Sequence, residues 1–146
     1  EAKDYIENYL ASYPDIRAYM TQIVEQGKKD GYVETILGRR RYIPELESKN
    51  RNIRNFGERI ALNTPIQGSA ADIIKVAMIG VARGLKQEGL KSQLLLQVHD
   101  ELIIDTEPGE EEAVKTLVEE VMRHAAELSV PLIVDAHFGK SWYDAK

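Results

Sequence analysis

Residues 93–106 read QLLLQVHDELIIDT, two short apolar runs separated by the pair His99-Asp100. Each run has the length and composition of a β-strand, so the segment predicts two strands joined by a tight turn. Because the runs are almost continuously apolar, we expect both faces of this hairpin to be covered. Tight hairpin turns favour Asn-Gly or Asp-Gly, which accept a positive φ, and His-Asp contains no glycine. The turn therefore indicates a role beyond chain reversal.

Upstream of this hairpin, apolar residues at helical spacing predict two helices. The first ends near Ser12, and the second begins at Pro14 and ends at Gly31, a typical stop signal. The following segment, YVETILGRRRYIP at 32–44, predicts a second β-hairpin around Gly38.

Between these two hairpins, residues 48–86 predict two further helices. Ser48 is a candidate N-cap for the first. Pro65 lacks the N–H that an uninterrupted helix uses, so we expect the first helix to end before Thr64 and the second to begin at Pro65.

The C-terminal third predicts one more helix and one more strand. Glu110, Glu111 and Glu112 suit the first turn of a helix, because negative charge there complements the helix dipole. We expect its buried stripe to contain Ala113, Leu117, Val121, Met122 and Leu128. Residues 132–138, LIVDAHF, predict a final strand, and Trp142 and Tyr143 are expected to anchor the C-terminus by packing. This order predicts an α+β fold with a mainly antiparallel sheet.

The composition excludes several classes of protein. The 146 residues contain no cysteine, which excludes disulfides and thiolate metal sites, and no apolar run is long enough to cross a bilayer. The net charge of −5 hides an asymmetry. Residues 1–92 carry 15 Lys+Arg against 12 Asp+Glu, whereas residues 93–146 carry 4 against 12. A basic stretch beside an acidic one is compatible with phosphate contacts, although ordinary charge scatter explains it equally well.

Two groups of residues are candidates for function. Asp100, at the tip of an apolar strand pair, is placed to ligate a hard divalent cation, with Glu101 adjacent to it. One carboxylate is not a metal site, however, and a merely solvated polar turn remains the alternative. Arg59, Asn63 and Gln67 recur every four residues, and such donors match the acceptors shared by A·T and T·A pairs in the minor groove. Their alternative role is to cap or solvate the break at Pro65.

Three segments together resemble the C-terminal part of bacterial family A DNA polymerases. They are GYVETILGRRRYIP at 31–44, NTPIQGSAADIIKVAM at 63–78 and LLLQVHDELI at 95–104, in the family's order. The C-terminal WYDAK is similar to Bacillus-type members. The resemblance implies that residues 1–45, two helices and a β-hairpin, end the fingers subdomain. Residues 46–146 would then form the C-terminal half of the palm, with motif C at the 93–106 hairpin.

The resemblance also implies roles for individual residues. Asp100 would ligate the two Mg²⁺ ions of nucleotidyl transfer, with Glu101 as an auxiliary carboxylate, and His99 would position the primer terminus. The residues implied to contact DNA are Arg59, Asn63 and Gln67 in the minor groove, Gln97 behind His99, and Arg54 and Arg39 to Arg41 at phosphates.

Two motifs of the family are missing from the sequence. Motif A, which carries the other metal-binding Asp, is absent. Residues 51–60 match only the centre of motif B, because Asn52 and Ile60 stand where that motif has Lys and Tyr. We therefore expect the chain to be part of a DNA polymerase that acts in replication and repair in the cytoplasm, in association with the nucleoid. We expect this part to be inactive by itself. Its expected partners are primer-template DNA, dNTP and the polymerase segment with motifs A and B, with no membrane. A non-catalytic DNA-binding module is the alternative. A small metal-dependent nuclease would need Asp72 or Asp105 near Asp100, and their spacing does not support it.

Overall fold

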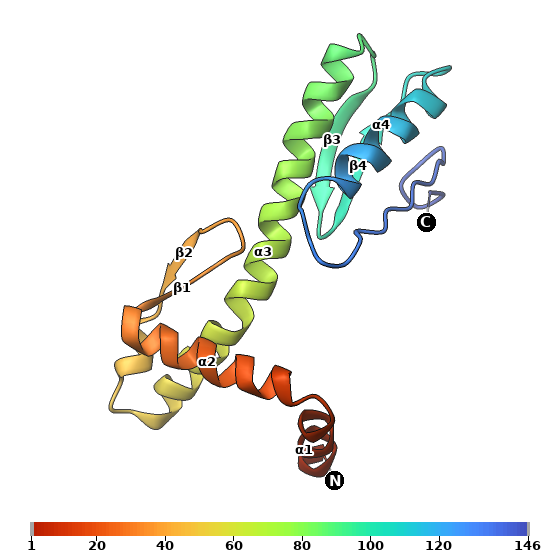
Figure 1. The fold of residues 1–146 in the computed structure, drawn as a ribbon. Helices are drawn as coiled ribbons and strands as arrows, with labels where there is room; N and C mark the ends of the chain where they lie inside the picture. Colours follow the sequence, from red (N-terminus) through yellow and green to blue (C-terminus); the bar gives the residue numbers. More distant parts are fainter. Residues whose placement is uncertain (1, 146) are drawn as a thin grey trace. The chain divides into compact units, whose positions relative to one another are not determined.

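The computed structural model of the chain describes residues 2–145 and divides into two compact units, Glu1–Ser69 and Ala70–Lys146. The elements, in order, are α1 (Ala2–Ser12), α2 (Pro14–Asp30), β1 (Tyr32–Glu34), β2 (Arg40–Tyr42), the 3₁₀ helix η1 (Pro44–Glu47), α3 (Arg51–Gln87), β3 (Gln93–Val98), β4 (Glu101–Asp105) and α4 (Glu111–Arg123) (Figure 1). Both sheets are antiparallel pairs, β1-β2 and β3-β4. The predicted α+β class is confirmed.

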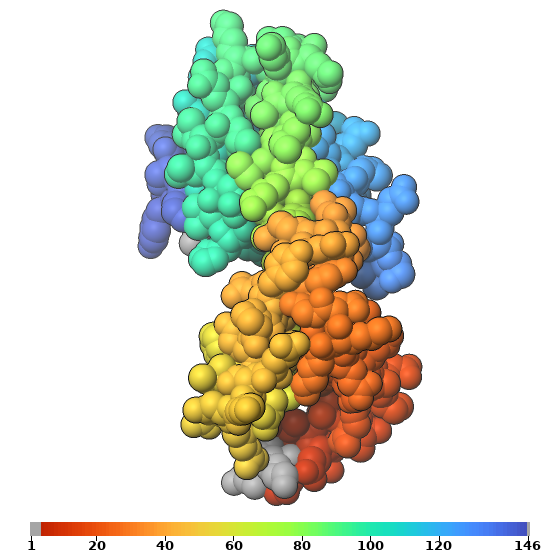
Figure 2. Space-filling model, turned by 90° about the vertical axis from the view of Figure 1, so that its left-hand side faces the viewer, coloured from red at the N-terminus to blue at the C-terminus, as the bar shows by residue number. Residues whose placement is uncertain are grey.

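In the N-terminal unit, local signals fix the ends of the elements as the sequence predicts. Gly31, in the left-handed region at φ 78°, ends α2 and donates its N–H to the carbonyl of Gly27. The β1-β2 hairpin then pairs Tyr32 with Tyr42. The core of this unit lies between α2, the hairpin, η1 and α3 and consists of Val33, Ile43, Leu46 and Ala61. The space-filling view shows α2 beside the segment that contains η1 (Figure 2).

The predicted helix break at Pro65 is wrong, because α3 runs without interruption from Arg51 to Gln87 with Pro65 inside it. Proline leaves the carbonyl four residues earlier without its helical donor, which costs about 3 kcal/mol. Tertiary contacts of the next turn, described below, offset this cost. The predicted cap is also wrong, since the side chain of Asn50, not Ser48, accepts the N–H of Asn52.

In the C-terminal unit, α3, β4 and α4 enclose a second core. Its fully buried members are Val81, Leu85, Val114 and Val118. The predicted stripe of α4 is therefore partly wrong, because Val114 is buried and Ala113 is exposed. The observed stripe also includes Leu117, Val121 and Met122, which pack against this core at helical spacing. Val114, which is larger than Ala113, occupies the inward position in the first turn.

The expectation that both faces of the β3-β4 hairpin are covered is also wrong in this structure. Leu102 and Ile104 of β4 pack against the second core. The pairing register shifts between Leu94 and Leu96, so Leu95 is the extra residue of a β-bulge. Leu95 and Leu96 are 56% and 55% exposed. The two helices of this unit cover one face of the hairpin, and no other element of the described chain covers the opposite face.

The predicted strand at 132–138 does not form, and no strand occupies these residues. A strand needs a hydrogen-bonding neighbour and an apolar layer beneath it. Within residues 2–145, β3 and β4 pair only with each other, and Ile133 is 84% exposed. The predicted packing of Tyr143 is wrong for the same reason, since its side chain is 88% exposed. Among the described residues, none of the helices is both long and apolar enough to span a membrane.

Candidate polymerase site residues

The tip of the β3-β4 hairpin has strained backbone geometry. Val98 pairs with Glu101, so only His99 and Asp100 form the turn. His99 has φ 55°, and it is the one non-glycine residue with a positive φ within residues 2–145. A side chain in this region costs about 1–3 kcal/mol and persists where surrounding contacts hold it. The turn thus places a histidine where glycine or asparagine is usual.

Gln97 stabilises this turn from β3. Its side-chain Nε2 donates a hydrogen bond to the backbone carbonyl of His99. This bond ties His99 to strand β3 and thereby restricts the backbone of Asp100, the next residue. Gln97, for which the sequence implied a DNA contact, has a structural contact within the turn.

The carboxylates of Asp100 and Glu101 are both exposed at the tip. Oε2 of Glu101 accepts a hydrogen bond of 3.1 Å from the indole N–H of Trp142. Carboxylate oxygens are the ligands that Mg²⁺ prefers, so the donor chemistry at the tip fits this ion. Within residues 2–145, however, no group of three or more His, Asp or Glu side chains could hold a metal. The two carboxylates at the tip are thus too few to form a metal site by themselves.

The second candidate group lies on α3 in the N-terminal unit. Arg59, Asn63 and Gln67 are all exposed, and the spacing of four residues places them in one row with a rise of about 6 Å per step. The guanidinium of Arg59 lies 5.9 Å from the ring centroid of Phe56, a cation–π contact. Because α3 is continuous, the row does not cross a helix break. An unbroken row favours a common binding surface over capping of a break.

The other predicted phosphate contacts have partners within the protein. Arg54 is half-buried and donates from Nη1 to the carbonyl of Ser48 at 3.0 Å. Nη2 of Arg39 donates to the carbonyl of Gly68 at 3.1 Å. Their positions are therefore set by the protein itself.

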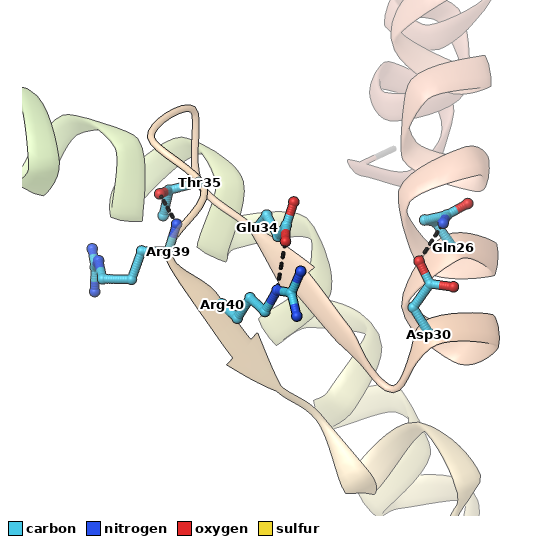
Figure 3. Close-up of polar contacts among 6 residues, drawn as sticks. All are labelled: Gln26, Asp30, Glu34, Thr35, Arg39 and Arg40. Atoms are coloured by element: carbon cyan, nitrogen blue, oxygen red, sulfur yellow. Dashed lines mark hydrogen bonds and ion pairs between the residues drawn. The ribbon is translucent and has the colours of Figure 1, made fainter.

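Arg40 is held by its neighbours on the β1-β2 hairpin. Its Nε lies 2.7 Å from Oε1 of Glu34 (Figure 3). Its guanidinium stacks 4.5 Å from the Tyr32 ring centroid. The hydrogen bond that Arg40 donates to Glu34, followed by the electrostatic interaction with Tyr32, raises the pKa of Arg40 above its ordinary value. Arg41, the other arginine of β2, is also exposed.

The contact between Trp142 and Glu101 was not predicted from the sequence. Trp142 was expected only to pack, but a partly exposed indole usually finds a partner for its N–H. That tendency indicates that the indole has an acceptor. It does not identify Glu101, which lies 41 positions earlier in the sequence.

Residues 1–144 match DNA polymerase family A, and the chain belongs to this family. It is similar to DNA polymerase I from Bacillus subtilis (strain 168), with 58% identity over the whole chain, and to DNA polymerase I from Geobacillus stearothermophilus, with 56%. The chain spans 17% of the length of each of these relatives. It also resembles the POL domain of Pol1 from M. smegmatis, solved in complex with DNA primer-template and dNTP. That match has a TM-score of 0.96 and 52% identity and covers 99% of this chain and 26% of that one.

Proposed function

We propose that the chain supplies one part of a family A DNA polymerase active site for Mg²⁺-dependent, template-directed nucleotide addition. In this proposal residues 1–45 end the fingers subdomain and residues 46–146 form the C-terminal half of the palm. The hairpin tip carries the proposal, because it presents an exposed Asp100 from a turn that His99 strains and Gln97 braces. The family membership and the primer-template complex of the M. smegmatis relative support it.

Each residue at the tip has a distinct task. Asp100 and Glu101 contribute carboxylate oxygens to the metal site. Mg²⁺ bound there would activate the primer 3′-hydroxyl and neutralise charge on the phosphates. Asp100 is free to turn toward the reacting groups, whereas Trp142 fixes Glu101 to one side, so we assign the principal metal contact to Asp100. His99, held by the turn, positions the primer terminus.

The α3 row holds the duplex through its minor groove. Arg59, Asn63 and Gln67 can all donate to the minor-groove acceptors that A·T and T·A pairs share. Such hydrogen bonds do not depend on the base sequence, but they form only when the minor-groove acceptors have the geometry of a correct base pair. This suits an enzyme that copies any template but must detect a mispaired primer end.

Reconstitution of primer extension tests this proposal. The chain alone is expected to incorporate no nucleotide, because its sequence lacks the motif A carboxylate. Mixing it with a polypeptide that carries motifs A and B should restore incorporation, and Asp100→Ala should abolish it. Incorporation by the chain alone would contradict the proposal.

The exposed α3 row also favours a second candidate function, a non-catalytic DNA-binding module. This alternative predicts salt-sensitive duplex binding that Arg59→Ala weakens and Asp100→Ala leaves unchanged. In reconstituted primer extension, the DNA-binding alternative predicts that Asp100→Ala does not lower the rate of nucleotide incorporation. This outcome separates it from the polymerase proposal.

A further inference from the structure

The loop of the β1-β2 hairpin, residues 35–39, is bonded to the middle of α3 at two points within the N-terminal unit. The backbone N–H of Ile36 donates to Oγ of Ser69 at 2.8 Å. Nη2 of Arg39 donates to the carbonyl of Gly68 at 3.1 Å. Within the loop, Oγ1 of the buried Thr35 accepts the backbone N–H of Arg39 at 3.1 Å (Figure 3). We call these residues the loop clasp.

The clasp acts on the helical turn that follows Pro65. Pro65 removes one helical hydrogen bond, and the hydroxyl of Ser69 donates back to the Pro65 carbonyl while accepting from Ile36. A carbonyl has two lone pairs, so Gly68 can accept from Arg39 in addition to its helical donor. The clasp thus adds bonds to the turn directly after the one in which the helix has lost a hydrogen bond.

Gly68 lets the loop approach the helix this closely. A Cβ at position 68 would lie 2.6 Å from Cγ2 of Thr35, a separation that real side chains do not tolerate. Only glycine leaves room for the contact without displacing Thr35. The packing of loop against helix therefore depends on this position as well as on the hydrogen bonds.

We propose that Arg39 is a positioning residue for DNA binding and acts through the orientation of Gln67. This inference rests on the proposed function. Gln67 precedes Gly68 directly and is exposed on the turn that the clasp holds, while Asn63 lies one turn earlier. By fixing the Gly68 carbonyl and the Ser69 hydroxyl, the clasp fixes the direction in which the Gln67 amide leaves the helix. A simple charge role for Arg39 at phosphate makes different predictions.

The first test needs no DNA. Amide hydrogen exchange is measured by NMR for residues 66–72 of the wild-type chain and of Arg39→Met, Ser69→Ala and Arg40→Met. Loss of one clasp bond should speed exchange in this turn about fivefold to tenfold in the first two variants. Arg40→Met is the matched control, because it removes the same charge from the adjacent residue, whose side chain bonds to Glu34 of β1. Equal exchange in all four proteins would overturn the clasp.

The second test is a double-mutant cycle in primer-template binding, followed by fluorescence anisotropy. Gln67→Ala should weaken binding in the wild type and in Arg40→Met by the same factor. Its effect should be smaller by about threefold or more in Arg39→Met and in Ser69→Ala, because Gln67 is already misplaced there. Ser69→Ala changes no charge, so the same loss in that variant separates positioning from phosphate attraction. Equal, additive effects in every background would contradict the positioning role.

The two tests fail independently. If Gln67→Ala and Asn63→Ala leave duplex binding of the wild-type chain unchanged, the proposed function fails, and the exchange experiment still decides whether the clasp holds the turn. If both alanine variants weaken binding but Arg39→Met behaves like Arg40→Met, the proposed function stands and the positioning role is wrong.

Discussion

Nε1 of Trp142 donates a hydrogen bond of 3.1 Å to Oε2 of Glu101, 41 residues earlier in the chain. This bond joins the C-terminal tail to the hairpin that carries Asp100. Trp142 is the single tryptophan of the sequence, so tryptophan fluorescence reports on the surroundings of this residue.

Replacing Glu101 should free the indole. Trp142 is 43% exposed in the structure, and loss of its acceptor in Glu101→Ala should increase acrylamide quenching of its fluorescence. Asp105→Ala removes a carboxylate from the far end of the same hairpin and serves as the control. Equal quenching in both variants and the wild type would show that the tail does not bind Glu101.

Strain at His99 predicts opposite effects of two substitutions. Glycine accepts φ 55° without steric cost, so His99→Gly should raise the free energy of unfolding by about 1 kcal/mol in urea titrations. His99→Ala keeps the strain and should not stabilise the protein. If His99 positions the primer, both variants should lower the rate of reconstituted primer extension. A glycine variant that is less stable than the alanine variant would disprove the strain.

Glu110 predicts a specific pH dependence of stability. Its carboxylate accepts the backbone N–H groups of Lys91 and Ser92 and the hydroxyl of Ser92. The hydrogen bond from the Lys91 backbone, followed by that from the Ser92 side chain, lowers the pKa of Glu110 below its ordinary value of 4.5. The bonds favour the charged form. Their stabilisation is therefore complete above that value and is lost as the pH falls through the lower pKa of the folded protein.

The variant Glu110→Gln isolates this contribution. The difference in urea midpoint between the wild type and Glu110→Gln should be constant above about pH 5.5 and should shrink below about pH 4.5. Glu112→Gln removes the same charge from the first turn of α4 without these bonds and should show a smaller difference with a weaker pH dependence. A wild-type advantage that grows on acidification would contradict the assignment.

Much of the secondary structure could be predicted because its signals are local. Pro14 and Gly31 delimit α2 through their own backbone preferences, and the two hairpins follow from short runs of residues that favour β-strands. Pro65 misled the prediction because the bonds that keep α3 intact come from Ile36 and Arg39. These residues lie about 30 positions earlier, where a local pattern carries no information about them.

The limits of prediction at the candidate site have the same origin. Helical spacing was enough to align Arg59, Asn63 and Gln67, and turn chemistry was enough to mark His99. The hydrogen-bond partners of Arg54 and Arg39 depend on the tertiary fold. Residue type and spacing along the sequence do not predict these partners. The roles of all these residues in binding DNA or metal stay predictions.

The second core and the exposed tail predict contrasting effects of truncating apolar side chains. Leu85 is 4% exposed and packs among residues of α3 and α4, so Leu85→Ala should lower the free energy of unfolding by about 2–5 kcal/mol. Ile133→Ala, at a fully solvated position, should change it by no more than about 0.5 kcal/mol. A large loss on Ile133→Ala, measured by urea titration, would mean that residues 132–138 pack as the predicted strand after all.

The central claim, that Asp100 is the metal-binding carboxylate of a polymerase site, is tested most directly by primer extension with a chimera. Residues 1–146 replace the matching segment of the DNA polymerase I from Bacillus subtilis, to which the chain is 58% identical. We expect the chimera to extend a primer in Mg²⁺. Asp100→Ala should lower the rate by about a thousandfold or more, as loss of a principal electrostatic contact does, while Asp105→Ala stays close to the unsubstituted chimera. A folded Asp100→Ala chimera that extends the primer as fast as Asp105→Ala would contradict the claim.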